Sequence, residues 1–471
     1  MSSTSPRLFG TSGIRGHTSR VNTDISLNLG RSLGTMLEGP GVVGVGTDAR
    51  TSGPVLLNSF RAGLLSTGVD VVSLGICPMP AVAFYSTLPG VLASVIITAS
   101  HNPPTDNGFK FFREGREFIR TEEAAIETAV ARHEYRSQKW LSVGTVAVCD
   151  IRMTYLRNAE RFLVTRGRTA SGMDVLVDSA NGAASDYTPH LLRNLGFRPV
   201  TINAHPDGHF PGRLPEPSPQ NLQQTMTLAA ETKMPLTVCH DGDGDRVAVI
   251  DEEGRFVDQN RVIALFARDE VERQNGGTVV ASIDTSSVID DVIRPLGGVV
   301  VRVPLGSLQE FLVLRNGTAV AFASEPWKPI FAAYGYWMDG VVGAARVAQM
   351  VDEDGSGSTV RLFSSIPEYP VLREQIPCPD HLKPDFMRLV RGSLISQVTL
   401  IDQINDSDGI RIDRSDGSYV LVRVSGTEPK ARVYIGARTR DTLDRLAQTA
   451  RSVMDKALEE AMHQHSSKPS P

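Results

Sequence analysis

Side chains that could hold a cation and a phosphoryl group are concentrated in a few short loops of this chain. Asp241, Asp243 and Asp245 alternate with glycines between two apolar segments, residues 236–238 and 247–250. In extended backbone such side chains point the same way, so the carboxylates can converge on one point. Carboxylates that close repel one another unless a cation lies among them, and Mg²⁺ prefers oxygen ligands. The pattern therefore predicts a divalent metal site, with a metal-free polar turn as the alternative.

An EF-hand calcium loop would also place aspartates at its first, third and fifth positions, and Glu252 falls at its twelfth. The sixth position is Arg246, where that loop needs glycine, and the flanking segments are typical of strands rather than helices. These two differences exclude an EF-hand. Arg246 either neutralises the aspartates or clamps a phosphate or sugar oxygen with its two-pronged guanidinium.

Ser100 follows an apolar run at residues 91–97 that is rich in β-branched side chains and typical of a strand buried in a parallel sheet. Pro103 and the proline after it force a turn. Ligands of open α/β sheets bind beyond the carboxyl ends of the strands, so Ser100 lies where chemistry is expected. A serine hydrolase is disfavoured because the G-x-S-x-G elbow is missing. In extended backbone His101 would also point away from Ser100.

Two further loops carry groups suited to phosphate. Residues 9–16, Phe-Gly-Thr-Ser-Gly-Ile-Arg-Gly, can present backbone N–H groups to an anion, and a flexible turn is the alternative. Residues 423–429, Arg-Val-Ser-Gly-Thr-Glu-Pro, offer a guanidinium fork and two hydroxyls, although a tight solvated turn would use similar residues. No Gly-Lys dipeptide occurs, which excludes a Walker-type P-loop. A serine, a metal site and two anion sites together suggest a phosphoserine that exchanges its phosphoryl group with a substrate.

The bulk composition narrows the class of protein. With 471 residues the chain is too long for one hydrophobic core. A net charge of −5 provides no basic field for nucleic acid or acidic lipid. The four cysteines form no CxxC pair, and no run approaches the roughly 18 apolar residues of a membrane span. We expect a reduced, cytoplasmic protein without a structural zinc; a homo-oligomer is one open outcome.

One pattern occurs three times, at residues 42–48, 175–182 and 279–286: an apolar strand that ends on aspartate, then small polar residues and a helix-like segment. Aspartate followed by serine or threonine is good helix N-cap chemistry, so each reads as a βα unit. A second strand follows each unit and ends in a polar loop, at Ser100, at 241–246 and at 323–328. The repeat predicts three similar α/β modules that each contribute one loop to a composite site.

From residue 371 the pattern changes to alternating strands and a terminal amphipathic helix, which predicts an α+β domain. The predicted domains are an α/β domain with the serine loop at 1–150, an α/β domain with the metal loop at 151–254, an α/β domain with a sugar-binding loop at 255–370, and a phosphate-binding α+β domain at 371–471.

The motifs at residues 9–16, 98–103, 241–246 and 423–429 resemble, in the same order, those of the α-D-phosphohexomutase family. The variants are most similar to its archaeal phosphomannomutase, phosphoglucomutase and phosphoglucosamine mutase members. The resemblance implies three α/β domains and a distinct fourth domain around a central cleft. It also implies an isomerase that interconverts the 1- and 6-phosphates of mannose, glucose or glucosamine.

The resemblance assigns roles to individual residues. A phosphoserine and a bisphosphorylated sugar, which serves as intermediate and activator, would carry the phosphoryl group. The implied catalytic residues are Ser100, Lys110, Arg15 and His101. The implied Mg²⁺ ligands are Ser100, Asp241, Asp243 and Asp245. The implied substrate-binding residues are Arg246, Ser324, Glu325, Lys328, Arg423, Ser425, Gly426 and Thr427.

One loop departs from the family pattern. Relatives usually carry Gly-Glu-x-Ser-Gly-His in the third domain, whereas residues 324–329 read Ser-Glu-Pro-Trp-Lys-Pro. The glutamate that grips sugar hydroxyls is kept as Glu325, but Trp327, Lys328 and Pro329 replace the serine, glycine and histidine. We expect Trp327 to stack on the sugar or narrow its pocket, and Lys328 to contact an anion or hydroxyl. An ordinary loop held by its prolines is the alternative.

Three functions stay open at this point. The first is the mutase of hexose or amino-hexose phosphates. The second is a phosphopentomutase, because the altered loop could fit a smaller sugar. The third is a phosphosugar-binding paralogue without turnover, against which the intact Ser100, Lys110 and aspartates argue. In each case the expected partner is a small phosphosugar, with no nucleic acid and no membrane.

Overall fold

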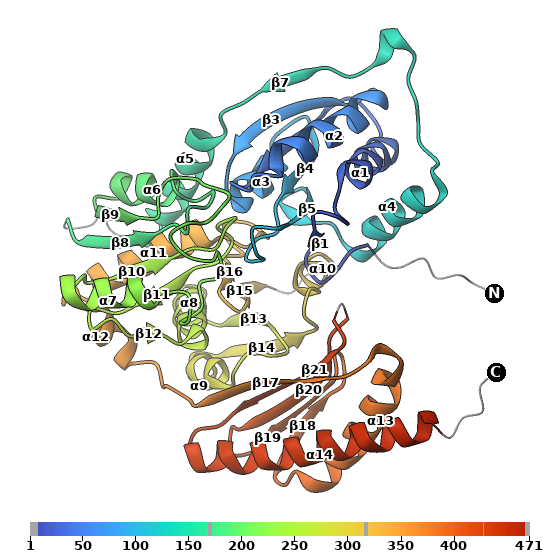
Figure 1. Cartoon of the computed structure of the whole chain (residues 1–471). Helices are drawn as coiled ribbons and strands as arrows, with labels where there is room; N and C mark the ends of the chain where they lie inside the picture. The colour runs from blue at the N-terminus through green and yellow to red at the C-terminus, as the bar shows by residue number, and fades with distance from the viewer. Residues whose placement is uncertain (1–7, 168–171, 315–318, 427, 467–471) are drawn as a thin grey trace.

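The computed structural model describes residues 8–167, 172–314, 319–426 and 428–466, which form four sheets with flanking helices (Figure 1). The first three sheets share a core of three parallel strands and one antiparallel strand, and the fourth is antiparallel throughout. The predicted fold class, three similar α/β domains followed by an α+β domain, is confirmed. No helix among the described residues has the length and apolarity needed to cross a membrane.

The first sheet has the strand order β1-β5-β4-β2-β3-β7, with β6 paired to β5. β4 is buried over its carboxyl half, as its apolar sequence predicts. The elements are β1 Ile14–His17, α1 Thr23–Met36, β2 Val42–Thr47, α2 Gly53–Ser66, β3 Asp70–Ile76, α3 Met79–Tyr85, β4 Val91–Ile97, β5 Asp106–Arg113, β6 Arg116–Glu117, α4 Arg120–Arg132, η1 Trp140–Ser142 and β7 Val146–Val148.

The second sheet has the order β12-β11-β10-β8-β9. The edge strand β12, Phe256–Val257, pairs with β11, so the second domain extends three residues beyond the predicted boundary at 254. The elements are α5 Arg152–Leu163, β8 Asp174–Asp178, α6 Thr188–Asn194, β9 Arg198–Ile202, α7 Gln223–Thr232, β10 Thr237–Cys239, β11 Ala248–Ile250 and β12 Phe256–Val257.

The third sheet has the order β14-β13-β15-β16. The elements are α8 Gln259–Arg273, β13 Gly277–Ser282, α9 Val288–Ile293, η2 Arg294–Leu296, β14 Gly298–Val303, α10 Leu308–Leu314, β15 Val320–Glu325, β16 Lys328–Ile330, α11 Gly340–Glu353 and α12 Thr359–Ser364.

The fourth sheet has the order β17-β21-β20-β19-β18, and α13 and α14 lie together on one side of it (Figure 1). The predicted apolar stripe of the terminal helix, from Leu443 to Ala457, is buried in this domain's own core. The elements are β17 Val371–Pro377, η3 Asp380–Leu382, α13 Lys383–Gln397, β18 Ile401–Asn405, β19 Ile410–Arg414, β20 Tyr419–Val424, β21 Lys430–Gly436 and α14 Arg440–Ser466.

The predicted repeat has a definite topology. In each of the first three domains the strand of the βα unit, β2, β8 or β13, lies between two parallel neighbours. One of these neighbours, β4, β10 or β15, is followed by a turn and then by a strand that pairs antiparallel with it. Each of the three predicted polar loops lies at that turn. The three loops are therefore equivalent positions of one repeated motif.

The aspartates that end the repeated strands do not cap helices, so the N-cap prediction was wrong. The helices α2, α6 and α9 begin after Ser52, Tyr187 and Ser287. Asp48 instead pairs with Arg50, and Asp178 accepts hydrogen bonds from Arg213 and Thr225. A buried strand end favours a cation or hydroxyl partner from a neighbouring loop over the first turn of a helix.

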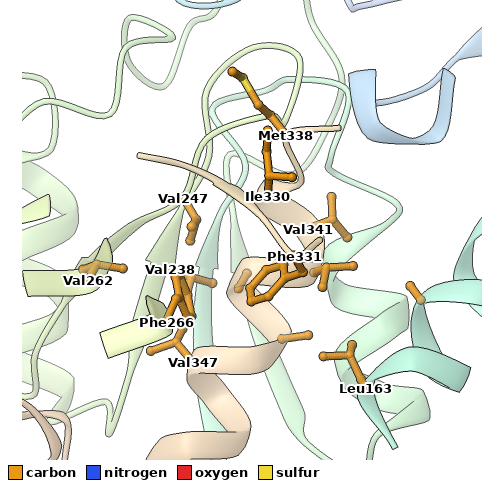
Figure 2. Packing of buried hydrophobic residues seen from close by; sticks show 14 of the residues in the cluster. Leu163, Val238, Val247, Val262, Phe266, Ile330, Phe331, Met338, Val341 and Val347 are labelled. Carbon is orange, nitrogen blue, oxygen red and sulfur yellow. The ribbon is translucent and has the colours of Figure 1, made fainter. Parts of the chain in front are cut away.

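The largest hydrophobic core crosses the first three domains, and Figure 2 shows where the second and third meet. Val238 and Val247 of the second domain face Phe266 of the third. Phe331 packs edge-on against Phe266, with the ring centroids 5.4 Å apart. The fourth domain has a separate core. A shared core fixes the loops of the first three domains relative to one another, which a composite site requires.

Candidate active site

Ser100 is fully buried at the turn between β4 and β5, with a left-handed φ of +53°. Such backbone is unfavourable for a residue with a Cβ and persists where neighbours hold it. The hydroxyl of Thr98 accepts from the Ser100 N–H at 2.8 Å. Ser100 Oγ donates to Asp241 Oδ2 at 2.7 Å and lies 3.4 Å from His101 Nδ1. Because Ser100 is not extended, the prediction that His101 points away from it was wrong.

Arg50 holds the serine loop, and the sequence analysis did not identify it. Its guanidinium is fully buried and donates to the carbonyl oxygens of Ser100 and Asn102 at 2.9 and 2.7 Å. It also donates to the carbonyls of Pro103 and Asp106. An arginine next to a repeated strand-end aspartate, within a few residues of a turn, is the signal that could have found it.

Asp241, Asp243 and Asp245 each offer a carboxylate oxygen within 4.8 Å of the others, and all three are buried. They converge through a turn, with Gly244 at φ +70°, and not through extended backbone as predicted. A Cβ on Gly242 would lie 2.6 Å from the Ser100 carbonyl oxygen, so glycine permits the two loops to approach.

The acidic cluster fits a divalent metal. The Oδ1 atoms of Asp243 and Asp245 are buried and have no hydrogen-bond donor among the described residues. Their Oδ2 atoms accept from Lys110 Nζ at 2.7 and 2.8 Å. Buried carboxylate oxygens without a donor are costly unless a cation binds them, and hard oxygen ligands suit Mg²⁺.

The carboxylates of the cluster differ in acidity. Burial and the charges of the other two aspartates raise the pKa of Asp241 well above its usual range. Burial also acts to raise the pKa of Asp245, but Lys110, Lys328 and Arg246 outweigh it and hold that pKa below the usual range. A proton thus resides more readily on the aspartate that faces Ser100.

Positive charge surrounds the serine loop. Burial alone would lower the pKa of Lys110, but two adjacent aspartates outweigh it and raise the pKa above its usual range. Burial, followed by the charges of Arg246, Arg15 and Lys328, lowers the pKa of His101 well below its usual range. Lys110 is therefore an ammonium and His101 a neutral imidazole at neutral pH.

Family models cover most of the chain. They describe the phosphoglucomutase/phosphomannomutase α/β/α domains I, II and III at residues 6–137, 153–254 and 258–369, and the C-terminal domain at 385–453. The chain belongs to the phosphoglucomutase/phosphomannomutase family. It is a mutase of the phosphohexomutase superfamily, and therefore an isomerase.

Relatives in this family carry different substrate names. A phosphopentomutase of Thermococcus kodakarensis is 39% identical over 97% of this chain and 99% of its own. A probable phosphoglucosamine mutase of Methanopyrus kandleri is 37% identical over 96% and 99% of the two chains. A solved family protein from Burkholderia thailandensis has a TM-score of 0.84 at 24% identity, covering 96% and 98% of the chains, which indicates a shared fold.

The loop that departs from the family pattern lies against the acidic cluster. Lys328 is 4% exposed, and its Nζ lies 3.5 Å from Asp245 and 3.7 Å from Glu325. Trp327 packs beside the core of the second domain, and its ring lies 5.4 Å from the Arg246 guanidinium. The indole thus packs against the Arg246 guanidinium. Lys328 places a positive charge beside the aspartates, at a position where the usual family pattern has glycine. The Ser324 hydroxyl donates to the carbonyl of Glu325.

A chain of polar contacts links the acidic cluster to the predicted phosphate loop of the fourth domain. Beyond Lys328, Glu325 Oε1 accepts from the Gly306 N–H at 2.9 Å. The neighbouring Leu305 N–H donates to Asp408 at 3.3 Å, and Asp408 pairs with Arg423 at 2.9 Å. These contacts connect the predicted site residues Lys328 and Glu325 of the third domain with Arg423 of the fourth domain.

Several buried donors in the family's predicted anion sites lack acceptors. The Nε atoms of Arg15, Arg246 and Arg423 have no hydrogen-bond acceptor within the part of the chain that the structure describes. Ser425 is buried beside Arg423 and Gly426 is exposed, whereas Thr427 lies outside the described residues. Guanidinium groups with unused donors suit phosphate oxygens.

Proposed function

We propose that this mutase moves a phosphoryl group between the 1-hydroxyl and the terminal hydroxyl of a sugar monophosphate, with Ser100 as the carrier. The position of Ser100 Oγ carries the proposal, because it lies 2.7 Å from Asp241 in a buried loop next to the carboxylate cluster. A phosphoserine would add a charge of about −1.5 to −2. The cations Arg15, Lys110 and Arg246 would offset that charge.

The reaction would proceed in two half-reactions. An oxygen of the sugar forms a bond to phosphorus while the Ser100 Oγ–P bond breaks, which gives a sugar bisphosphate and free Ser100. The bisphosphate turns around, and Ser100 accepts the other phosphoryl group. In each half-reaction the attacking hydroxyl loses a proton and the leaving oxygen gains one. Lys110, an ammonium in this state, can donate its proton to the leaving oxygen and recover one from the attacking hydroxyl. Arg423 and its loop would hold the phosphate that is not reacting.

A metal ion would assist this chemistry. Asp241, Asp243 and Asp245, together with the phosphoserine, would hold Mg²⁺, which when bound offsets charge on the phosphoryl oxygens. The buried Oδ1 atoms of Asp243 and Asp245, which no donor in the described part of the chain reaches, support this assignment. A sugar bisphosphate would act as activator by phosphorylating Ser100. We place this chemistry in the cytoplasm, as the composition predicts.

The test compares Ser100→Ala with Ser94→Ala, a serine of the preceding strand β4 that is equally buried and donates to a backbone carbonyl. After incubation with a sugar bisphosphate, mass spectrometry should find stoichiometric phosphate on Ser100 of the wild type and of Ser94→Ala. Ser100→Ala should lose the phosphate, and its turnover should fall at least about 10³-fold. Phosphate on another residue, or full activity of Ser100→Ala, would refute the proposal.

Two sugar classes fit this reaction. The 1- and 6-phosphates of mannose, glucose or glucosamine are supported by relatives named phosphoglucosamine mutase. The 1- and 5-phosphates of a pentose are supported by the relative named phosphopentomutase and by Lys328. Lys328 fills space between Glu325 and Asp245, at a position where the usual family pattern has glycine, which favours the smaller sugar. We therefore favour the pentose class.

A panel of ribose, glucose, mannose and glucosamine 1-phosphates with Mg²⁺ and the matching bisphosphate separates the classes by kcat/KM. Higher kcat/KM on the ribose phosphate supports the pentose class, and the reverse order supports the hexose class. No turnover on any of the four sugar phosphates would favour a phosphosugar-binding protein and overturn the proposed reaction.

A further inference from the structure

The outer rim of the first domain carries an exposed apolar strip, residues 137–148. Every residue of the strip is exposed except Gly144, and Lys139 is its one charged residue. Figure 1 shows β7 on the rim of this domain, at the opposite end of the view from the fourth domain. The exposed apolar side chains are Trp140 at 81%, Leu141 at 76%, Val143 at 50%, Val146 at 45% and Val148 at 84%.

One edge of β7 has no strand partner among the described residues. β7 pairs with β3 on its other side and ends the sheet. The Thr145 carbonyl accepts a hydrogen bond from the Val71 N–H of β3, and the Cys149 N–H donates one to the Ser73 carbonyl of β3. Because main-chain groups alternate between the two sides of a strand, those of Val146 and Val148 point away from β3. Such an edge is a template for another strand.

We propose that two copies of this chain pair antiparallel through β7, about a two-fold axis at Ala147. Val146 would lie opposite the partner subunit's Val148, and Val148 opposite the partner subunit's Val146. Each pair exchanges two main-chain hydrogen bonds, and Ala147 forms the central pair without hydrogen bonds. The two first-domain sheets then become one continuous sheet, and no edge at β7 is left open.

The chemistry of the strip favours a second copy over an unrelated partner. A two-fold interface brings each residue against the same surface, so a charged strip would repel itself, but this strip is almost neutral. Its five apolar side chains expose on the order of 500 Å². A standard interface buries about 800 Å² on each partner. The apolar side chains of the strip would form the centre of such an interface. Natural edge strands that stay free usually carry charges or proline, which β7 lacks.

Sedimentation equilibrium of the full chain tests the proposal. The wild type should have twice the chain mass of 51.0 kDa. The double variant Val146→Lys/Val148→Lys should raise the dimer dissociation constant more than about 100-fold, because four valines leave the interface and four charges enter it. Val299→Lys is the matched control, since this valine is 61% exposed on β14, the edge strand of the third sheet. A monomeric wild type, or a double variant that stays dimeric, would overturn the proposal.

Cross-linking tests the register and does not depend on how well the charged variant folds. In a Cys149→Ser background, Ala147→Cys should form an intersubunit disulfide under mild oxidation, because central pairs bring the Cα atoms to about 4.5 Å. Val299→Cys in the same background should not. Both variants should keep mutase turnover, since neither residue belongs to the proposed site. A dimer that Ala147→Cys cannot cross-link would refute pairing through β7.

Discussion

The guanidinium of Arg50 donates to the carbonyl oxygen of Ser100 at 2.9 Å, although the two residues lie 50 positions apart. Arg50 comes from the loop after β2, and Ser100 from the turn after β4, which is parallel to β2. The same arginine is paired with Asp48, whose carboxylate also accepts from Thr98. One buried cation thus holds the left-handed backbone that aims the Ser100 hydroxyl at Asp241.

Arg50→Lys should lower kcat without raising KM. A lysine keeps the charge but cannot reach several carbonyls with a planar fork, so the serine loop would shift. Misplacement of a nucleophile by about 1 Å costs on the order of 100-fold in rate. Steady-state kinetics at saturating Mg²⁺ and activator measure the effect, with Arg61→Lys at a partly exposed position of α2 as the control. An equal loss in both variants, or unchanged kcat in Arg50→Lys, would contradict the role.

Lys110→Met should make the protein more dependent on a divalent cation for its stability. The change leaves Asp243 and Asp245 without their ammonium partner, and an uncompensated buried charge costs about 3–5 kcal/mol. Addition of Mg²⁺ should then raise the Tm more in Lys110→Met than in the wild type, although turnover falls about 10² to 10⁴-fold. Lys233→Met, at an exposed helix end, serves as control. An equal Tm rise in all three proteins would show that Lys110 and the cation do not share these carboxylates.

The architecture was predictable because its signals are local. Each strand before a polar loop is a short, mostly buried run that the loop interrupts, so β4, β10 and β15 follow from the sequence. The terminal helix follows from the spacing of its apolar residues. The segment after the metal loop was predicted to be a strand, but the antiparallel direction of β5, β11 and β16 was not predicted, because a short buried strand has the same composition in either direction.

The candidate site was predictable in its residue types and not in its contacts. Ser100 and the aspartates were identified from their chemistry, and the roles assigned to them stay predictions. Arg50 was missed because its partners are backbone carbonyls 50 or more positions along the chain. The strand-end aspartate two residues before it is a local signal, but it does not reveal those carbonyls. The place of Trp327 beside Arg246 depends on how the second and third domains pack, which a local motif does not encode.

Lys328→Gly, which restores the residue usual in the family, should shift specificity toward hexose phosphates. Removal of the side chain between Glu325 and Asp245 opens space beside the sugar site and removes one cation. A single methylene in a binding pocket already changes relative kcat/KM about 10 to 200-fold, so loss of the whole lysine side chain should change the ratio at least about 10-fold. The ratio of kcat/KM for glucose 1-phosphate over ribose 1-phosphate measures the shift, with Lys430→Gly as control because that lysine pairs with Glu428 in the fourth domain. An unchanged ratio would mean that Lys328 does not limit the sugar.

Asp339→Asn should change how stability depends on pH. Asp339 joins the second and third domains by accepting from the hydroxyl of Tyr155 at 2.8 Å, and burial raises its pKa to about 6. Between pH of about 4 and 6 the folded state therefore holds a proton that the unfolded state has lost. The stability from this group is full below about pH 4 and is lost as the pH rises through 6.

The difference in unfolding free energy between wild type and Asp339→Asn should accordingly be larger at pH 5 than at pH 7.5, by about 1.4 kcal/mol for one pKa unit. Chemical denaturation at the two pH values measures it, and Asp402→Asn, at an exposed position of β18, should show no such change. A difference that is the same at both pH values would mean that Asp339 is ionised at pH 5. The Tyr155 hydroxyl and the indole N–H of Trp337 would then stabilise the carboxylate more than burial destabilises it.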